Sequence, residues 1–556
     1  MKWKKLEHNG ILFPPDFETK KIKIKIKGES VDLDINQEEM VYQWAKKKDT
    51  PYALDKVFQK NFLADFAKTF GKKYKKLELD DVDFKNAFNL VDKEKDAKEL
   101  LTKEEKKALA AKRKELREEM KVKFGTGKMD GNEVEIANYM AEPPGIFIGR
   151  GEHPLRGKWK PKVTSKDVTL NLGKEAKVPV GNWGKIVHDQ ESMWMASWTD
   201  FLTQKRKYVW LADTAGIKQD RDKAKYDKAK MLAKEIETIK NKIVKDMQSK
   251  DPKVRRISTV CWLIYRTAMR VGDEKDPDEA DTVGATTLRK EHVTLTSDAI
   301  KFDFLGKDSV RWQETVPAVG NDKQFHENLK ELTAKIKATD EIFGNLTSRD
   351  VNEYYKTVVK GLTAKVFRTF SASTVVSKYL NENGDVKKGS QMEKLYHAKL
   401  ANLEAAIMCN HKRTIPKTFE QSLQKKRDTL KTAEKATPWK KNEEVLKKAE
   451  STKTKTDAQE KKRKERITKI KGMIKKSKAK QKERVEKLRL QLDLTEKTRD
   501  YNLGTSLRNY IDPRIFKSWT DEVTADWEKL YTAALQKKFL WVKSENESWQ
   551  NVSKHY

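Results

Sequence analysis

Apolar and polar positions alternate differently in successive parts of the chain. Ile22, Ile24 and Ile26 are separated by single lysines, a pattern that predicts a half-buried strand. Residues 92–121 are dense in Lys and Glu and are expected to form a solvated helix pair. Residues 159–212 return to spacing by two, with Gly, Asn and Asp between the apolar runs. This region is predicted to form a small sheet with hairpins.

From about residue 217 to 414 the apolar positions recur mostly at helical spacing, most clearly in the amphipathic segment 256–271. One hairpin is expected to interrupt the helices. Its strands are residues 292–295 and 299–304, joined by a turn. The chain then continues through 305–309 into another strand, which places Lys307 at a second tight turn.

Residues 421–500 differ from the preceding segments in their charge. They contain 28 Lys and Arg against 13 Asp and Glu, a surplus of 15 positive charges. A narrow apolar seam keeps its helical phase along this segment. The seam consists of Ile467, Ile470, Ile474, Val485, Leu488 and Leu492. With a reversal at 451–456, the pattern predicts an antiparallel helical hairpin, kinked near Pro438. A second arm of about 38 residues would extend ~57 Å.

A disordered lysine-rich tail is the alternative explanation for this segment. An ordered sequence resumes after it, however, which argues against that alternative. Residues 498–556 are few but rich in large aromatic side chains, so they are expected to dock on another part of the chain. These side chains are Trp519, Trp527, Phe539, Trp541 and Trp549.

Composition narrows the class of protein. The 556 residues are enough for more than one domain. A net charge of +34 favours polyanionic partners, with nucleic acid first and a merely basic, ribosome-like protein as the alternative. No apolar run approaches the ~20 residues of a membrane span, and the first residues lack an apolar signal core. The two cysteines, Cys261 and Cys409, fit a reducing compartment.

Four known motifs are incomplete or absent in the sequence. Residues 125–128 contain the Gly-Lys of a phosphate-binding loop, but Met129 replaces the required Ser or Thr and Val122 stands at the first glycine position. We predict a turn there. The histidines and cysteines lack zinc spacing, and the acidic residues of 272–276 resemble neither a calcium loop nor a two-metal cluster. No metal and no nucleotide cofactor is therefore expected.

Five separated residues lie in informative contexts. They are Arg270 within 267–275, Lys307 within 304–309, Arg368 within 361–369, His411 within 409–413 and Tyr510 within 503–514. With these contexts the chain resembles the eukaryotic-type DNA topoisomerase I family (type IB), whose catalytic core is related to that of tyrosine recombinases. The resemblance covers nearly the whole chain, including residues 4–10 and 142–154.

The resemblance implies a chemistry that suits these residue types. Tyr510 attacks a DNA phosphodiester; Arg270, Arg368 and His411 bind the charge on its oxygens, and Lys307 protonates the departing 5′ oxygen. Forming a phenolate at pH 7 costs ~4 kcal/mol, which nearby guanidinium groups reduce. The 3′-phosphotyrosyl product stores the bond energy, so neither ATP nor metal is required.

Taken alone, each of these residues has an ordinary structural explanation. Arg270 suits a buried ion pair with Glu274 or Asp281, and His411 suits a polar position near a helix end. Their occurrence together, in one order and in matching contexts, favours the catalytic interpretation.

Further positions match DNA contacts of the family. They are Arg150, Lys218, Asp308, Lys365, Asn410 and Asn509. Lys218 is expected to contact a backbone phosphate, with a solvated lysine as the alternative. Phe147, Arg150, Asp308 and Asn509 match positions around the cleavage site, where camptothecin-type inhibitors of the family stack between base pairs. Ile148, Asp273 and the pair Phe370–Ser371 depart from the common pattern, which puts inhibitor sensitivity and sequence preference in doubt.

The implied fold is α+β and mainly α, a bilobed clamp around duplex DNA. Residues 1–215 would form a mixed α/β cap and 216–415 a tyrosine-recombinase-like helical catalytic lobe. Residues 416–497 would form an antiparallel coiled-coil linker, and 498–556 a small helical C-terminal domain carrying Tyr510. The implied enzyme is a monomer that prefers supercoiled DNA and relaxes positive and negative supercoils. It would act in the nucleus, or in a virus-infected cell if the lineage is viral.

Two other functions are alternatives to this one. A tyrosine recombinase uses nearly the same residues but predicts a short interval between histidine and tyrosine, whereas 99 residues separate His411 from Tyr510. A non-catalytic basic DNA-binding protein is compatible with the charge, because nonspecific affinity comes mostly from phosphate contacts. Residues 461–466 suit a nuclear-import signal or the solvated face of the hairpin.

Overall fold

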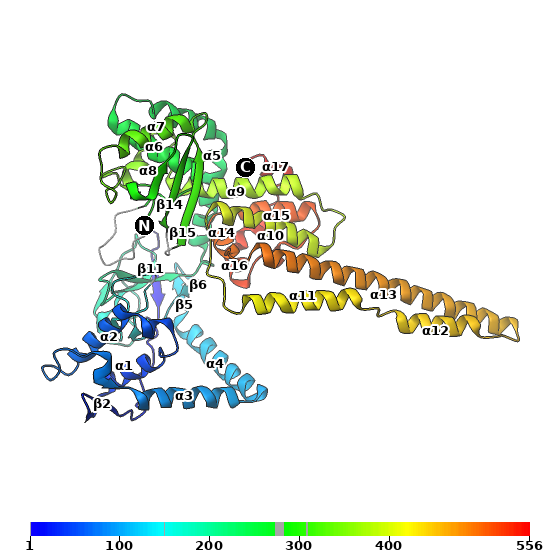
Figure 1. Cartoon of the computed structure of the whole chain (residues 1–556), viewed down its shortest axis with the longest axis horizontal. Coiled ribbons are helices and arrows are strands. Elements are labelled where there is room, and N and C mark those ends of the chain that lie inside the picture. The colour runs from blue at the N-terminus through cyan, green and yellow to red at the C-terminus, as the bar shows by residue number, and fades with distance from the viewer. Residues whose placement is uncertain (1, 150, 273–282, 307–309) are drawn as a thin grey trace. The chain divides into compact units, whose positions relative to one another are not determined.

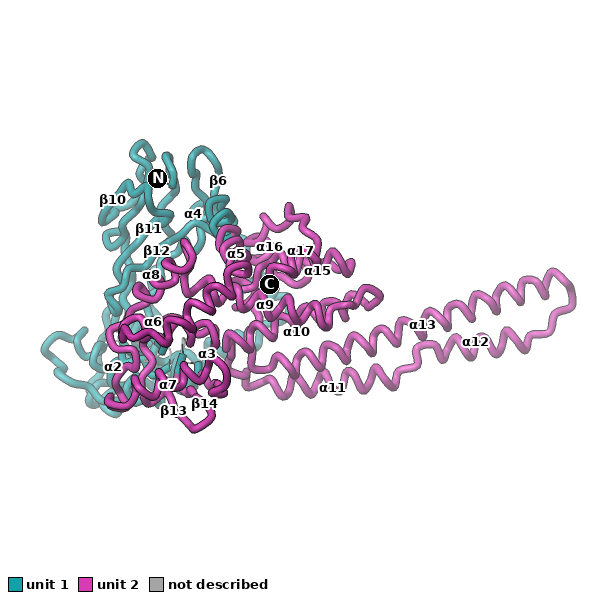
Figure 2. Tube along the Cα trace, turned by 90° about the horizontal axis from the view of Figure 1, so that it is seen from above, with its two compact units in different colours: residues 1–222, 274–283, 305–311 teal, residues 223–273, 284–304, 312–556 magenta. Residues whose placement is uncertain are grey.

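The computed structural model describes residues 2–149, 151–272, 283–306 and 310–556. The chain divides into two compact units (Figure 2). Unit 1 comprises Met1–Asp222, Glu274–Val283 and Leu305–Arg311, and unit 2 comprises Lys223–Asp273, Gly284–Phe304 and Trp312–Tyr556. Helices predominate beside sheets of two to seven strands, in agreement with the predicted mainly helical α+β class. None of the described helices has both the length and the apolar character needed to cross a bilayer.

Unit 1 contains a seven-stranded sheet with the order β1-β5-β6-β12-β11-β9-β10. Its strands are β1 Leu6–His8, β5 Thr126–Met129, β6 Asn132–Ala137, β9 Thr169–Asn171, β10 Lys185–Val187, β11 Trp194–Thr199 and β12 Arg206–Leu211. Strands β9 and β10 pair in parallel, whereas β11 pairs antiparallel with both β9 and β12. Alternate residues such as Leu170, Val209 and Leu211 fill one core. The predicted β character of 159–212 is therefore confirmed.

The prediction of a turn at 125–128 is wrong. Thr126–Met129 forms strand β5, which pairs antiparallel with β1 on one side and with β6 on the other. The reversal lies instead at Asp130 and Gly131, which have positive φ angles of 51° and 84°. The glycines that resemble a phosphate-binding loop in sequence obscure the strand, because Gly127 provides no side chain to the period-two pattern.

A second core of unit 1 is built on helices α1 Ile35–Ala45 and α2 Lys56–Lys68. Strand β2, Ile24–Ile26, lies between β3 Glu29–Val31 and β4 Val82–Asp83 and confirms the predicted strand. Trp44 stacks on Phe62 with ring centroids 4.6 Å apart. The short strands β7 Gly145–Ile146 and β8 Trp159–Lys160 pair with each other.

The predicted solvated helix pair of unit 1 is also present. Helix α3 spans Lys85–Leu100 and α4 spans Lys103–Phe124, so the pair begins seven residues earlier than predicted. Thr102 separates the helices, because its side chain accepts a hydrogen bond from the Glu105 backbone and caps α4. No residue of α4 is buried.

Unit 2 combines a helical core with a three-stranded sheet. Its helices before the hairpin are α5 Gly216–Asp246 (from Lys223 onward), α6 Pro252–Thr267, α7 Asp322–Thr333, α8 Ser348–Val358, α9 Ala364–Asn383 and α10 Gln391–Met408. The sheet order is β13-β14-β15, with strands β13 Val293–Leu295, β14 Ala299–Gly306 and β15 Val310–Pro317. The predicted hairpin is thus confirmed. The predicted turn at Lys307 lies outside the described residues.

A long helical hairpin belongs to unit 2. Helices α11 Phe419–Lys435 and α12 Lys440–Ser451 form one arm, and the 41-residue α13, Asp457–Lys497, forms the other. Both views show the arms side by side and extending away from the other helices of this unit (Figures 1 and 2). Ile470 and Ile474 are buried in the seam, and Gln481 Nε2 donates to the Ala433 carbonyl. The first arm is therefore interrupted near Pro438, as predicted, and the second is slightly longer than predicted.

The C-terminal residues pack on α9 and α10 through four short helices, α14 Leu503–Asn509, α15 Pro513–Glu522, α16 Ala533–Lys538 and α17 Trp549–Ser553. The five aromatic side chains that predicted docking all join this core, four of them buried and Trp541 partly buried. Their partners include Ala372, Val376, Leu380, Ala401 and Ala405. The expectation that this segment docks on the chain is confirmed.

Candidate active site

Tyr510 lies in a three-residue link between two helices. Helix α14 ends at Asn509, and the Tyr510 N–H still donates to the Ser506 carbonyl at 2.9 Å. Asp512 then caps α15, whose first residue is Pro513. The link is short and anchored at both ends, so the half-buried Tyr510 side chain is presented from a defined backbone position.

The Tyr510 ring lies against two of the other candidate residues. It stacks on the His411 imidazole with ring centroids 5.5 Å apart and an interplanar angle of 25°. The Arg368 Cζ lies 5.1 Å from the centroid of the same ring. The three side chains come from the link between α14 and α15, from the segment after α10 and from α9. Three of the five residues predicted from sequence therefore meet in one place.

Arg368 connects the segments that carry the other candidates. Its side chain is buried, with Nη1 donating to the Ala268 carbonyl at 2.8 Å and Nη2 to the Cys409 carbonyl at 2.5 Å. Ala268 ends α6 in the left-handed conformation, two residues before Arg270. Cys409 precedes His411 by two residues. One guanidinium thus holds both neighbouring backbones at fixed positions.

Arg270 lies on a loop that packs against residues 284–286. Its carbonyl accepts from the Ala285 N–H at 2.8 Å. Gly272 has a φ of 86°, and a Cβ there would come within 2.9 Å of the Gly284 Cα, so the close approach requires glycine. Glu274 and Asp281, the alternative ion-pair partners of Arg270, lie outside the described residues.

His411 is buried beside these guanidinium groups. Burial and the positive charges of Arg368 and Arg270 lower its pKa to about 3. The imidazole is therefore neutral at pH 7 and carries a single N–H. Its Nδ1 lies 3.3 Å from the Ser506 Oγ, so the ring has an Nε2–H when Ser506 donates to Nδ1.

Two buried nitrogen atoms of the site are unsatisfied. Within the described structure, His411 Nε2 and Arg368 Nε have no hydrogen-bond partner. An unpaired buried polar group costs roughly 1–3 kcal/mol, a cost that a bound water, ion or ligand removes. Both belong to side chains that contact the Tyr510 ring. Together with the nearby Arg270 charge, they favour an anionic ligand beside Tyr510.

Three predicted site residues lie outside the described part of the chain. These are Lys307, the predicted general acid, and Arg150 and Asp308, predicted to contact DNA. Lys218, also a predicted DNA contact, lies in unit 1, where its Nζ donates to the Leu211 carbonyl at 2.5 Å. The contact neither supports nor contradicts the prediction that Lys218 contacts a backbone phosphate of DNA.

The remaining predicted DNA contacts adjoin the site in sequence. Lys365 is exposed on α9, one turn before Arg368. Asn410 precedes His411 in the left-handed conformation, with φ 51°. Asn509 is exposed, and its Nδ2 donates to the Thr505 carbonyl at 3.1 Å.

Sequence reasoning missed two buried serines of the site. Ser506 faces the His411 ring, and Ser373, on α9, contacts the Tyr510 carbonyl through its Oγ at 3.4 Å. Ser506 lies four residues before Tyr510, a helical spacing that could have identified it. Ser373 lies 137 residues from its partner, and no local pattern indicates that contact.

Comparison with known families covers most of the chain. Residues 1–211 match the family model described as eukaryotic DNA topoisomerase I, DNA binding fragment, and residues 214–445 match its catalytic core. Residues 482–551 match a C-terminal topoisomerase domain. The three matches follow the chain in order and include Arg270, Arg368, His411 and Tyr510.

Curated relatives named DNA topoisomerase 1 align along nearly the full chain. DNA topoisomerase 1 alpha of Arabidopsis thaliana is 36% identical over 97% of this chain and 58% of its own length, so the chain spans little more than half of that relative. The Candidozyma auris relative is 33% identical over 99% of this chain and 83% of its own length. The Homo sapiens relative is 33% identical over 97% of this chain and 71% of its own length. The chain belongs to the eukaryotic DNA topoisomerase I family.

Proposed function

We propose that this chain is a type IB DNA topoisomerase, which cleaves and reseals one strand of duplex DNA through Tyr510. One observation carries the proposal. The Tyr510 ring lies against Arg368 and His411, and each of these side chains has a buried nitrogen without a partner in the described structure. A phosphodiester bound beside Tyr510 would satisfy these atoms and meet the nucleophile at the same place.

In the proposed reaction the Tyr510 Oη attacks the phosphorus atom while the bond from phosphorus to the 5′ oxygen breaks. The phenol loses its proton to solvent, and Lys307 supplies the proton that the 5′ oxygen gains. Arg270 and Arg368 hold the non-bridging oxygens as negative charge accumulates there. Each preorganised donor of this kind is worth roughly 3–4 kcal/mol in the transition state.

His411 would act as a neutral hydrogen-bond donor. With a pKa lowered to about 3, its ring is not protonated at pH 7. Its contribution is therefore an Nε2–H···O hydrogen bond, made available when the Ser506 hydroxyl donates to Nδ1. Two guanidinium groups already supply the positive charge, so a neutral donor adds stabilisation without further repulsion.

The proposed intermediate explains why no energy source is needed. One phosphoester bond replaces another, so the free 5′ hydroxyl can reverse the step. While the strand is open, the downstream duplex would rotate about the intact strand and relax supercoils of either sign. Lys365, Asn410 and Asn509, with Arg150, Lys218 and Asp308, would contact the DNA. The hairpin's surplus of 15 positive charges would slow rotation where DNA comes within ~8 Å of it.

The remaining expectations follow from the family. We propose duplex DNA as the partner, because residues 1–211 match the DNA binding fragment of the family. Monomeric action, a nuclear location and a camptothecin-type inhibitor site at the cleavage position stay predictions. A recombinase is disfavoured by the long helical hairpin between His411 and Tyr510. A non-catalytic basic protein would not need two buried, unsatisfied nitrogens beside a tyrosine.

A plasmid assay tests the function. Supercoiled plasmid is incubated with wild-type protein or Tyr510→Phe in EDTA and without ATP. We expect relaxation by the wild type alone, with both proteins binding the plasmid. Failure of both to relax it would leave a DNA-binding protein as the better description, and relaxation by Tyr510→Phe would assign the nucleophile elsewhere.

A further inference from the structure

The backbone that follows Tyr510 is held by a buried polar network. Ser373 Oγ, on α9, accepts from the Asp512 N–H at 3.0 Å and lies 3.4 Å from the Tyr510 carbonyl oxygen, to which it donates. Ser373 and Asp512 are both fully buried. Because α9 also carries Arg368, one helix contacts both the tyrosine backbone and the tyrosine ring.

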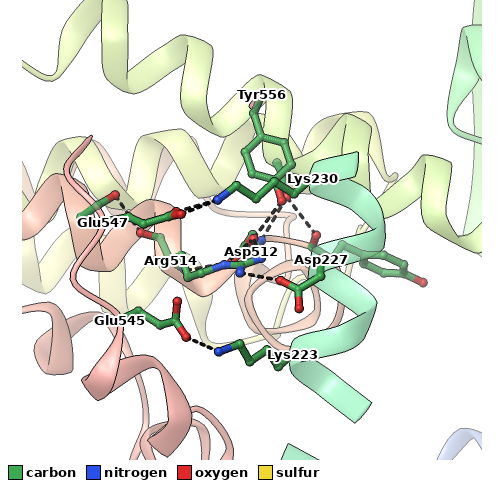
Figure 3. A network of polar contacts seen from close by, with 11 residues as sticks. Lys223, Asp227, Lys230, Asp512, Arg514, Glu545, Glu547 and Tyr556 are labelled. Carbon is green, nitrogen blue, oxygen red and sulfur yellow. Dashed lines mark hydrogen bonds and ion pairs between the residues drawn. The ribbon is translucent and has the colours of Figure 1, made fainter. Parts of the chain in front are cut away.

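Asp512 is the centre of this network, as Figure 3 shows. Its carboxylate caps α15 through the Arg514 N–H at 2.9 Å and pairs with the Arg514 Nη2 at 2.7 Å. Arg514 Nη1 continues to Asp227 on α5 at 2.6 Å. The Tyr556 hydroxyl donates to Asp512 Oδ2 at 2.8 Å. Residues far apart in the sequence therefore converge on the residue two positions after Tyr510.

The ion pairs at the edge of this network are partly exposed, unlike the buried contacts of Asp512. Lys223 pairs with Glu545 at 2.6 Å and Lys230 with Glu547 at 2.7 Å, at the partly exposed edge of the network in Figure 3. Exposed pairs contribute little to stability. The buried contacts at Asp512 matter more, because a buried carboxylate that loses a donor is left poorly solvated.

We propose that Ser373, Asp512 and Tyr556 are positioning residues. They hold the Tyr510 backbone at the position from which its ring contacts Arg368. The inference rests on the proposed function and adds residues that do not touch the phosphate. Burial and the Asp512 charge raise the pKa of the Tyr556 phenol well above its usual range, so Tyr556 remains a donor at physiological pH. Its ring also packs near Phe370 of α9, at a centroid distance of 6.2 Å.

A network that positions Tyr510 should affect cleavage and religation differently, whereas a network that only contributes to packing should not. Before cleavage, the protein must hold Tyr510 in line with the phosphate. After cleavage, the covalent bond to DNA holds the tyrosine in place. Loosening the network should therefore slow cleavage while religation changes little, and a misplacement of ~1 Å is enough to cost about a hundredfold in rate.

The test uses Tyr556→Phe and Ser373→Ala, which each remove a hydroxyl and keep most of the packing. Single-turnover cleavage and religation are measured on a defined duplex, together with DNA affinity. We expect cleavage to fall roughly tenfold to a hundredfold, with religation and Kd within about twofold of wild type. Glu547→Gln is the matched control, since it removes a charge at the edge of the network and should cleave as wild type does.

Hydrogen exchange separates this inference from the proposed function. Peptides covering residues 503–512 should exchange faster in both variants, whereas those from the N-terminal part of α9 should not. Unchanged exchange at 503–512, unchanged cleavage, or equal losses in cleavage and religation would overturn the positioning role. Absence of cleavage by the wild type would instead refute the proposed function, and the exchange data would still decide whether the network holds Tyr510.

Discussion

His411 shows how its surroundings set the chemistry of a single residue. The ring is buried and lies beside two guanidinium groups, which together lower its pKa to about 3. A cationic imidazole would repel Arg368 and Arg270, whereas a neutral imidazole can contribute one N–H. The same side chain contacts Ser506 and stacks on Tyr510, so its orientation is constrained from two sides.

This environment predicts a pH-dependent stability. Between the ordinary histidine pKa of 6.5 and the folded value of about 3, the unfolded chain binds a proton that the folded chain does not. The contribution of His411 is thus fully present above pH 6.5 and falls by about 1.4 kcal/mol per pH unit below it. Urea unfolding, followed by tryptophan fluorescence at pH 7.5 and 5.5, should show a smaller pH dependence for His411→Gln than for wild type. Equal dependence would contradict the assigned environment.

Ser506 is expected to select the His411 tautomer. Without its hydroxyl, the ring can place its proton on either nitrogen, so Ser506→Ala should slow cleavage about threefold to tenfold, equivalent to a hydrogen bond of about 1 kcal/mol. DNA affinity should not change. Ser258→Ala, which removes a fully buried hydroxyl bonded within α6, is the control. A cleavage rate in Ser506→Ala equal to that of the control would remove Ser506 from the site.

At the scale of elements, the hairpin depends on few apolar contacts. Its buried seam is narrow, with Ile470, Ile474 and Gln481 buried on α13, and most of its remaining surface is charged. Ion pairs between the arms, such as Arg427 with Glu496 at 2.6 Å, are partly exposed and add little. The stability of the outer part of the hairpin should therefore depend on Ile470 and Ile474, which pack with Ala449 of α12.

Ile474→Ala tests this distribution. Removal of a buried isoleucine side chain is expected to cost about 2 kcal/mol or more. Hydrogen exchange should accelerate in α12 and in the facing part of α13, while the helices around Tyr510 keep their protection. Lys475→Ala, at the neighbouring exposed position, should leave the exchange unchanged. Equal effects of the two substitutions would show that the seam does not hold the arms together.

The hairpin can also be shortened at its base. The Lys426 Nζ and Thr495 Oγ1 lie 2.7 Å apart, so a short flexible linker can replace residues 428–493. We expect this variant to cleave DNA at the wild-type rate and to relax more supercoils per cleavage event in single-molecule rotation measurements. Loss of cleavage would contradict the separation of chemistry from control of rotation.

Much of the element structure could be predicted from periodicity. The strand at Ile24–Ile26, the β13–β14 hairpin and the two helical arms all follow patterns of period two or 3.6. Strand β5 could not, because its glycine gives the pattern no side chain. Sequence contexts predict the residues of the candidate site. They do not predict the hydrogen bonds that Arg368 donates to two carbonyls, or the one that the Asp512 N–H donates to Ser373, because these bonds join distant segments. Such tertiary hydrogen bonds leave no local periodicity.

At the scale of the whole molecule, the net charge of +34 should govern DNA affinity. Each phosphate that a protein neutralises releases counterions, so log K should fall linearly with log salt concentration at about −0.9 per phosphate contact. We expect a steep fall between 50 and 200 mM salt. The hairpin-shortened variant should show a shallower slope if the basic hairpin lies near the DNA, as we propose. An identical slope would place the hairpin away from the DNA.

The most direct test of the central claim is to trap the covalent intermediate. A duplex whose cleaved 5′ end dissociates prevents religation, so the adduct accumulates and can be mapped by mass spectrometry. We predict that the 5′-labelled strand becomes attached to Tyr510 through its 3′ phosphate and that Tyr510→Phe forms no adduct while still binding the duplex. An adduct at another residue, or one carried by the 3′-labelled fragment, would contradict the account.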